Sequence, residues 1–420
     1  GIDVVVGSWD EKQTKPLFGC LLQYPNTHGE VVDYRGFIKE QKEKGAVVIM
    51  AADLLSLAVL TPPGEMGADI CVGSSQRFGV PMGFEGPHAG FFAVKDLYKR
   101  KIPGRIVGLS KGASGEPVYR LSLQTREQHI RRDKATSNIC TAQALLANIA
   151  AMYAVYHGPQ GIQEIACETN RLAKTLNFLL QKEGSVKQKN KHFFDTLCLE
   201  FLSPEAAKQS MKRAQQAFVN LRQIESKCVC VTFDETMSYK DVEVLFGVLT
   251  AKKADVFVQE HLHSSKSFPE DLTRKTPYLQ AKVFHENHSE TKMLRYIKDL
   301  EKKDLSLTSS MIPLGSCTMK LNASVEMEPL SWSEVSGHHP FCPSDQIKGY
   351  QQMLLDVEAM FCEITGLSAV SLQPNSGAQG EYTGLLTIKA FLKNKGEKKR
   401  RVCFVPESAH GTNPASAVMA

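Results

Sequence analysis

The chain has 420 residues, enough for two or three domains of common size. Hydrophobic residues make up 42% and charged residues 23%, which excludes a disordered, collagenous or fibrous chain. The 50 basic and 45 acidic residues leave a net charge of +5, too small an excess to indicate a dedicated nucleic-acid-binding protein.

Cysteine usage and apolar runs bear on the compartment. Eleven cysteines are scattered singly through a long chain, which favours a reducing compartment over a secreted disulfide scaffold. No apolar run approaches the ~18 residues of a membrane span, so we expect no membrane partner. Residues 1–7 resemble the middle of an α/β domain, so we expect either a processed protein or a fragment.

Residues 1–155 are predicted to form a mainly parallel sheet covered by helices. Apolar residues at helical spacing over 33–45 predict a helix between the first two strands. A segment at 139–156 is apolar on every face and is followed by Gly158, which predicts a buried helix. Short apolar runs between turns predict four strands, at 17–22, 47–51, 70–72 and 90–94.

A different pattern over about 159–280 predicts a separate α+β domain. Apolar residues over 162–179 recur at the spacing of a long amphipathic helix. Alternating runs at 193–199 and 227–233 predict strands, each followed by a helix. The polar stretch 286–310 suits a helix end and a linker.

Beyond residue 310 the order of helix, turn, helix, strand and loop again indicates an α/β domain. The helices are expected at 350–365 and 378–393, and the strand at 402–406.

Two cysteines share one face of a predicted strand. Cys228 and Cys230 lie two residues apart, so both side chains point the same way, which could suit a metal. No second Cys or His pair follows at ligand spacing. We therefore predict buried core thiols and no metal site.

Two segments of the last region could bind a ligand. Residues 373–382 place small residues where a loop turns into a helix, so that backbone N–H groups and the helix dipole would face a phosphate. An ordinary helix capped by Ser376 explains the same residues. The loop 406–416 follows an apolar strand and offers the ring of His410 and the hydroxyl of Thr412. Together the two segments predict a planar, phosphorylated cofactor.

Several long runs of the sequence resemble the P-protein family of the glycine cleavage system, the glycine dehydrogenases (decarboxylating). The runs that carry this resemblance lie throughout the chain, at 23–30, 73–79, 134–141, 310–322, 339–343, 375–382 and 410–416.

The resemblance implies an α/β fold, the PLP-dependent transferase fold-type I that is like aspartate aminotransferase, with an α+β small domain. Family members have two homologous halves, and only the second carries the cofactor, pyridoxal 5'-phosphate (PLP). Residues 1–155 would be the later part of the large domain of the non-catalytic first half. Residues 156–305 would be its small domain and linker, and residues 306–420 the beginning of the catalytic second half.

The resemblance also implies how the second half would hold the cofactor. Ser376, Gly377 and Ala378 would bind the PLP phosphate. His410 would stack on the pyridine ring, and Thr412 would contact the ring substituents.

On the substrate side, the resemblance places Ser316, Thr318 and His339, which together with His410 form the expected catalytic set. The lysine that forms an imine with PLP would lie beyond Ala420, so the chain by itself is expected to be inactive.

The first half is expected to be catalytically silent. PLP enzymes hold the cofactor on a lysine amine and pair its ring nitrogen with an acid. Asp53 stands where the resemblance places the acid, but Gln76 stands where it places the lysine, and an amide nitrogen cannot form the imine. The loop 81–87 would be a relic of the glycine-rich loop of an active unit.

The activity implied by the resemblance is that of an oxidoreductase acting on CH–NH2 with a disulfide acceptor. It would release CO2 from glycine and pass the aminomethyl group to the lipoyl arm of the H protein, with the T and L proteins as indirect partners. The resemblance further implies a homodimer in the mitochondrial matrix, with a bacterial cytoplasm as the alternative.

Two other functions remain open from the sequence. The chain could be a non-catalytic scaffold or dimerisation half of a PLP-fold protein, because it lacks the imine lysine. It could instead be a nucleotide-binding α/β protein, in which case ATP or NAD should protect it against heat while PLP should not.

Overall fold

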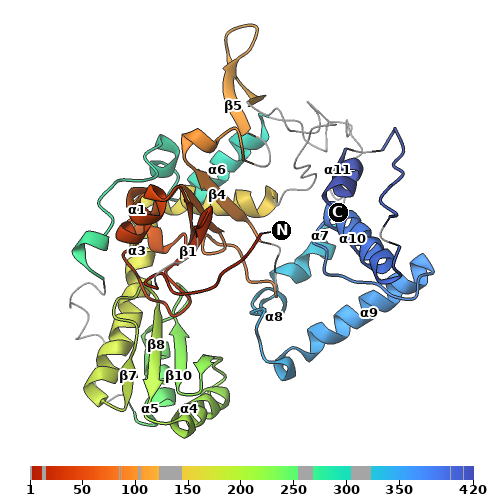
Figure 1. Ribbon diagram of the computed structural model, residues 1–420. Coiled ribbons are helices and arrows are strands. Elements are labelled where there is room, and N and C mark those ends of the chain that lie inside the picture. The colour runs from red at the N-terminus through yellow and green to blue at the C-terminus, as the bar shows by residue number, and fades with distance from the viewer. Residues whose placement is uncertain are drawn as a thin grey trace. The chain divides into compact units, whose positions relative to one another are not determined.

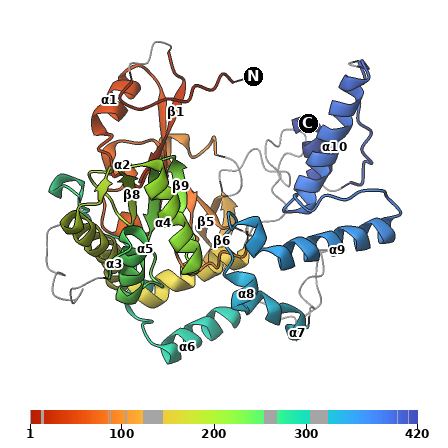
Figure 2. The same ribbon diagram turned by 90° about the horizontal axis from the view of Figure 1, so that it is seen from below.

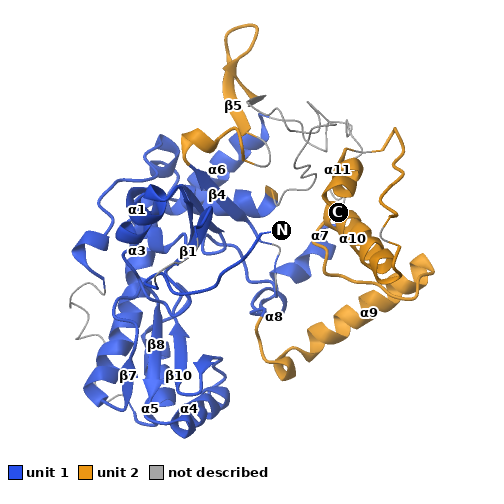
Figure 3. Ribbon diagram, viewed as in Figure 1, with its two compact units in different colours: residues 1–94, 145–340 blue, residues 95–144, 341–420 orange. Residues whose placement is uncertain are grey.

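The computed structural model describes residues 2–11, 16–84, 86, 88–102, 106–122, 144–253, 268–303, 323–397, 399–409 and 411–420. The chain divides into two compact units, one of residues 1–94 and 145–340 and the other of residues 95–144 and 341–420 (Figure 3). Within the described ranges, no helix is both long enough and apolar enough to cross a bilayer.

The first unit begins with a four-stranded sheet in the order β1-β2-β3-β4 (Figure 1). Neighbouring strands are parallel from β1 to β3, and β4 runs antiparallel to β3. The predicted, mainly parallel sheet is confirmed, with strand bounds within about two residues of those expected from the apolar runs. The strands are β1 (Gly19–Tyr24), β2 (Val47–Ala52), β3 (Ile70–Ser74) and β4 (Gly90–Val94).

Helix α1 (Arg35–Glu43) connects β1 to β2, which confirms the predicted β-α-β unit, and α2 (Pro63–Met66) precedes β3. Ile38 of α1 is 1% exposed and packs in one core with the fully buried Met50 of β2. Burying side chains of this size stabilises the fold by about 1.5–3 kcal/mol each relative to leaving them exposed.

Helix α3 (Ala144–Glu183) is kinked at Gly158, whose φ is 64°. Pro159 follows and begins the next helical segment, because a proline suits the first turn of a helix but not its interior. Gly158 thus ends the first segment, as predicted. The expectation that this segment is buried on every face is wrong, since Leu145 is 66% exposed. Leu146, Ala150 and Ala154 recur at every fourth position and so form one buried face, and Val155 is buried next to Ala154.

The later part of α3 packs on a second, antiparallel sheet in the order β7-β8-β10-β9. Helix α4 (Pro204–Gln216) follows β8, and α5 (Tyr239–Thr250) follows β10, as predicted. Each helix begins at a serine, and the side chain of Ser203 accepts the N–H of Ala206 at 3.2 Å. The strands are β7 (Val186–Gln188), β8 (Thr196–Phe201), β9 (Arg222–Glu225) and β10 (Cys228–Thr232).

Three further helices belong to the first unit (Figure 2): α6 (Glu290–Glu301), α7 (Ser324–Met327) and α8 (Ser333–Ser336). α6 is a complete helix where only a helix end was expected. Ser289 caps it by accepting the N–H of Lys292 at 3.4 Å.

Among its described residues, the second unit contains a hairpin and three α-helices. The helices α9 (Lys348–Thr365) and α10 (Gly377–Asn394) confirm the two predicted ones. The predicted strand 402–406 is not formed, because no described strand lies beside it to exchange backbone hydrogen bonds. The remaining elements are β5 (Ile106–Lys111), β6 (Pro117–Ser122) and α11 (Thr412–Met419).

Candidate functional site

Three charged side chains meet at the carboxyl ends of β1 and β2. Asp53 directly follows β2, Arg77 lies in the turn after β3, and Asp195 precedes β8. Nη1 of Arg77 lies 2.7 Å from Oδ2 of Asp195 and 3.7 Å from Oδ2 of Asp53. We call these three residues the charged cluster. It links the parallel sheet of the first unit to the antiparallel sheet of the same unit.

The surroundings of the charged cluster shift its ionisation. Burial raises the pKa of Asp53 to about 6; the charge of Arg77 acts in the opposite direction, and that of Asp195 in the same direction. Burial by itself lowers the pKa of Arg77, but the two carboxylates outweigh it, so that the pKa is raised and the guanidinium stays charged. Nε and Nη2 of Arg77 are buried and have no hydrogen-bond partner among the described residues, so the cluster holds this side chain through Nη1.

A cavity of about 330 Å³ lies beside the charged cluster. Residues from both sheets line it, and its two aspartates are balanced by Arg77 and Arg222. Cavities at the carboxyl ends of parallel strands are where open α/β sheets bind ligands. None of the described residues in this lining is a lysine, so the cavity offers no side-chain amine to a carbonyl cofactor.

Gln76 takes no part in the cavity lining. Its Nε2 donates to the carbonyl oxygen of Pro81 at 3.4 Å, and its N–H donates to Oγ of Ser74 at 3.2 Å. The side chain therefore holds the turn after β3, which is a structural use of the position where the resemblance expects a lysine in an active unit.

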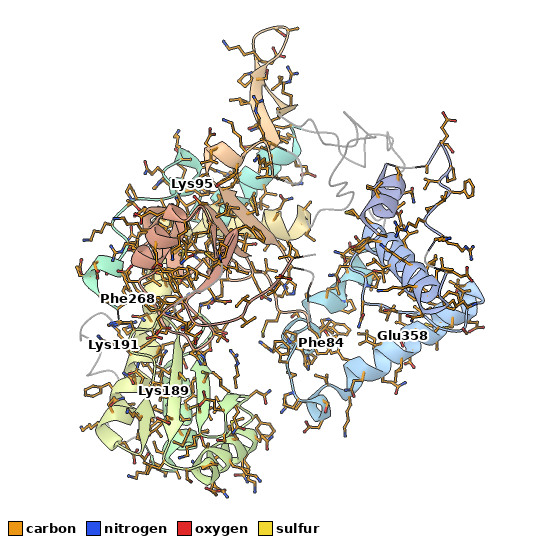
Figure 4. The ribbon with its side chains drawn as sticks, viewed as in Figure 1. Phe84, Lys95, Lys189, Lys191, Phe268 and Glu358 are labelled. Atoms are coloured by element: carbon orange, nitrogen blue, oxygen red, sulfur yellow. The ribbon has the colours of Figure 1, made fainter. Side chains whose placement is uncertain are left out.

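Gly83 and Phe84 of the predicted relic loop 81–87 lie against the segment that precedes His339. The N–H of Gly83 donates to the carbonyl oxygen of Ser336 at 2.8 Å. The N–H of Phe84, which is labelled in Figure 4, donates to the carbonyl oxygen of His338 at 3.0 Å. His339 itself is exposed. No local sequence pattern could have indicated this contact, because it joins loops far apart in the chain.

In the second unit, the N-terminus of α10 has the geometry of an anion site. Oγ of Ser376 accepts the N–H of Gln379 at 3.3 Å, and Oε1 of Gln379 accepts the N–H of Asn375 at 2.9 Å. The first N–H groups of a helix have no intrahelical partner, so those of Gly377 and Ala378 point out of the helix end. A Cβ added at Gly377 would meet nothing within 4 Å, which leaves room for a ligand.

The two ligand-binding segments predicted in the second unit come together in the structure. α10, residues 403–409 and the start of α11 border one hollow of about 530 Å³. Thr412, the first residue of α11, is 4% exposed. Oγ of Ser416 donates to Oε2 of Glu381 at 3.4 Å, which joins α11 to α10.

The predicted site residues are distributed unevenly. Ser376, Gly377, Ala378 and Thr412 lie in the second unit, whereas His339 lies in the first. Ser316, Thr318 and His410 fall outside the described residues. Two residues of the charged cluster, Arg77 and Asp195, were not predicted from the sequence, and only the position of Arg77 directly after Gln76 could have drawn attention to it.

The fold defines an α/β protein of fold-type I, with a cavity beside the charged cluster in one unit and a helix end with open N–H donors in the other. A solved structure is similar, the "glycine decarboxylase (P-protein) of the glycine cleavage system, in inhibitor-bound form". It has a TM-score of 0.52 and 34% identity, covering 58% of this chain and 57% of that one.

The sequence comparisons identify the family. A family model described as "Glycine cleavage system P-protein" matches residues 1–249. The whole chain aligns at 51% identity with the glycine dehydrogenase (decarboxylating) of Stutzerimonas stutzeri and at 53% with that of Synechocystis. It aligns at 50% with the mitochondrial enzyme of Solanum tuberosum. The chain belongs to the glycine cleavage system P-protein family. It spans 44%, 43% and 41% of the length of these three relatives.

Proposed function

We propose that the chain is part of a PLP-dependent glycine decarboxylase of the glycine cleavage system. The observation that carries this proposal is the 50–53% identity to proteins named glycine dehydrogenase (decarboxylating) over the whole chain. The reaction would release CO2 from glycine and transfer the remaining aminomethyl group to the lipoyl arm of the H protein.

The residues at the start of α10 suit the phosphate of PLP. The N–H groups of Gly377 and Ala378 would donate to its oxygens, and the hydroxyl of Ser376 would add a donor once it rotates from its capping role. Bound PLP supplies an electron sink that accepts the electron pair left when CO2 departs. His410 would cover one face of the ring, and Thr412 would hold its substituents. These contacts to the phosphate, the ring face and the ring substituents would together hold the ring in one orientation relative to the substrate.

We assign Ser316, Thr318 and His339 to the substrate side. Their hydroxyl and imidazole groups can donate hydrogen bonds to a carboxylate and so orient glycine. We further propose the lipoylated H protein as direct partner, the T and L proteins as indirect ones, and a homodimer. The potato relative is named as mitochondrial, whereas the Stutzerimonas and Synechocystis relatives are bacterial proteins, so we propose the mitochondrial matrix with a bacterial cytoplasm as the alternative.

For the first half we propose a structural role. Asp53 stands beside the cation of Arg77 at 3.7 Å, and Gln76 holds a turn. In an active unit the corresponding aspartate would face the ring nitrogen of PLP. Here Asp53 faces the guanidinium of Arg77 instead. We keep the division into a large domain at 1–155, a small domain at 156–305 and the start of the second half at 306–420 as part of this proposal.

The full-length protein, incubated with PLP, glycine and lipoylated H protein, tests the proposal. We expect exchange of labelled bicarbonate into the carboxyl group of glycine that depends on all three components. Borohydride reduction followed by peptide mapping should then locate the cofactor lysine outside residues 1–420. Absence of exchange would contradict the activity, and a specific adduct on a lysine within 1–420 would contradict the silent first half.

A further inference from the structure

Two cysteines of the antiparallel sheet lie directly opposite each other. Cys198 of β8 is paired with Cys230 of β10. The N–H of Phe233 donates to the carbonyl oxygen of Asp195, and the N–H of Phe201 donates to that of Lys227. The pairs at the two ends of this ladder are therefore hydrogen-bonded pairs. Since the two kinds of pair alternate in an antiparallel ladder, the cysteines form a non-hydrogen-bonded pair.

This kind of pair brings side chains closest together. Its Cα atoms are about 4.5 Å apart, within the roughly 4.4–6.8 Å that a disulfide requires. The neighbouring pair on the same face shows how close such side chains come, because the hydroxyl oxygens of Thr196 and Thr232 lie 3.0 Å apart. Cys198 and Cys230 are free thiols, 3% and 4% exposed, which confirms that Cys230 is buried, as the sequence predicted.

The surroundings of the pair favour the thiolate form of Cys198. Hydrogen bonds from the thiol of Cys230 and from His28 lower the pKa of Cys198 to about 6. The same interaction raises the pKa of Cys230, so Cys230 keeps its proton and Cys198 is the thiol of the pair that ionises. The thiolate is the nucleophilic form of cysteine. Cys230 also lines the cavity of about 330 Å³, so a small oxidant that enters the cavity comes to Cys230, which lies directly opposite Cys198.

We propose that Cys198 and Cys230 form a reversible disulfide, with hydrogen peroxide as the oxidant. The Cys198 thiolate attacks one oxygen of the peroxide, the O–O bond breaks, and the leaving hydroxide takes up a proton to become water. The sulfur of Cys230 then attacks the resulting sulfenic acid, its proton goes to the departing oxygen, and a second water leaves. Two thiols are oxidised and one peroxide is reduced to two waters. A small dithiol reverses the reaction by exchange.

Formation of the disulfide would change the contacts of the loop after β1, which lines part of the cavity. His28 lies in the loop after β1, and Thr27 of the same loop is bound by Arg222 through its carbonyl oxygen at 3.1 Å and its hydroxyl at 2.9 Å. Oxidation replaces the thiolate that accepts from His28 by a neutral disulfide sulfur. The loop then keeps its contact with Arg222 but loses the charged partner of His28.

Cys228 provides a matched control on the same strand and the same face. It is paired with Glu200 instead of a cysteine. Its sulfur lies 3.5 Å from Oε2 of Glu225 and 3.8 Å from Nζ of Lys189, which is labelled in Figure 4. Burial, followed by the bond to Glu225, raises the pKa of Cys228, so this thiol stays protonated. It is equally buried but lacks an opposed thiol.

Peroxide treatment of the native full-length protein, followed by alkylation and non-reducing peptide mapping, tests the proposal. We expect one linked peptide that joins Cys198 to Cys230 and disappears with dithiothreitol. Cys228→Ser should retain this link, whereas Cys198→Ser and Cys230→Ser should lose it. His28→Leu should slow its formation several-fold, since leucine offers the thiolate no hydrogen-bond donor.

The wild-type result decides the matter even if a serine variant fails to fold. Absence of the linked peptide, a link that includes Cys228, or a link that forms only in urea would each overturn the proposal. Decarboxylase activity is not part of this readout, so the outcome is independent of the proposed function.

Discussion

The charged cluster of the first unit and the N-terminus of α10 in the second unit differ in what their polar groups face. Asp53, Arg77 and Asp195 are mostly buried and point at one another. The N–H groups at Gly377 and Ala378 have no partner within the helix, and a Cβ added at Gly377 would meet open space. Charges that pair internally hold two sheets together, whereas donors left open can receive an anion. This difference leads us to expect a structural role for the charged cluster and a ligand at the start of α10.

The largest effect is expected from Arg77→Met, which leaves the carboxylates of Asp53 and Asp195 without their cation. Breaking a buried ion pair costs about 3–5 kcal/mol. Because 22% of the Arg77 side chain is exposed, we expect the free energy of unfolding in urea to fall by about 3 kcal/mol, towards the lower end of that range.

Arg35→Met is the matched control for this change. Arg35 also bridges two aspartates, Asp33 and Asp271, but all three side chains are at least 40% exposed. Exposed ion pairs contribute less than about 1 kcal/mol. Equal losses in the two variants would show that the charged cluster is no more than a surface ion pair.

A smaller effect is expected from pH through Asp53. Its pKa is about 6 in the folded protein against an ordinary value of 3.8, so the folded state holds the proton more tightly. The contribution of Asp53 to stability is therefore complete below pH 4 and is lost as the pH rises to about 6. The rise from 3.8 to about 6 corresponds to about 3 kcal/mol in full, at about 1.4 kcal/mol per pKa unit, and we expect about 2 kcal/mol of it to be lost between pH 4 and pH 6.

Urea unfolding of the wild type and of Asp53→Asn at several pH values measures this contribution. Other carboxylates have lowered pKa values and act in the opposite direction, as Asp33 does because of Arg35. The difference between the two proteins isolates Asp53. If that difference does not change between pH 4 and 6, the carboxyl titrates at its ordinary pKa.

The smallest effect on stability is expected from Ser376→Ala, which removes the cap of α10. Loss of a serine cap costs about 1 kcal/mol. We also expect about tenfold weaker binding of PLP to the full-length protein, because a hydrogen bond to a charged group contributes about 1.5–3 kcal/mol. Absorbance titration with PLP measures the affinity.

Ser203→Ala is the control for this variant, because Ser203 caps α4 through the same kind of bond to the third helical residue. It should cost a similar amount of stability while leaving PLP affinity unchanged. Equal loss of affinity in both variants would assign Ser376 a capping role only, which is the alternative that the sequence left open.

Most of the secondary structure could be predicted from the sequence because its signals are local. The parallel strands appear as apolar runs, and the helices α9 and α10 appear as 3.6-residue periodicity that ends at a glycine or a charged run. The expected strand 402–406 failed for a reason that is not local, since a strand requires a neighbour to pair with. The prediction that the helix ending at Gly158 is buried was also wrong, because composition does not reveal which face of a helix packs against another element.

The sequence by itself determined the fold class, the family and the helix end that suits a phosphate, because these depend on neighbouring residues and on long runs shared with relatives. Tertiary structure alone decided that Arg77 stands between Asp53 and Asp195, and that Cys198 lies opposite Cys230. Such contacts depend on strand register and on the packing of one sheet against another. A shift of one residue would turn those side chains to the other face, and no local pattern records that choice.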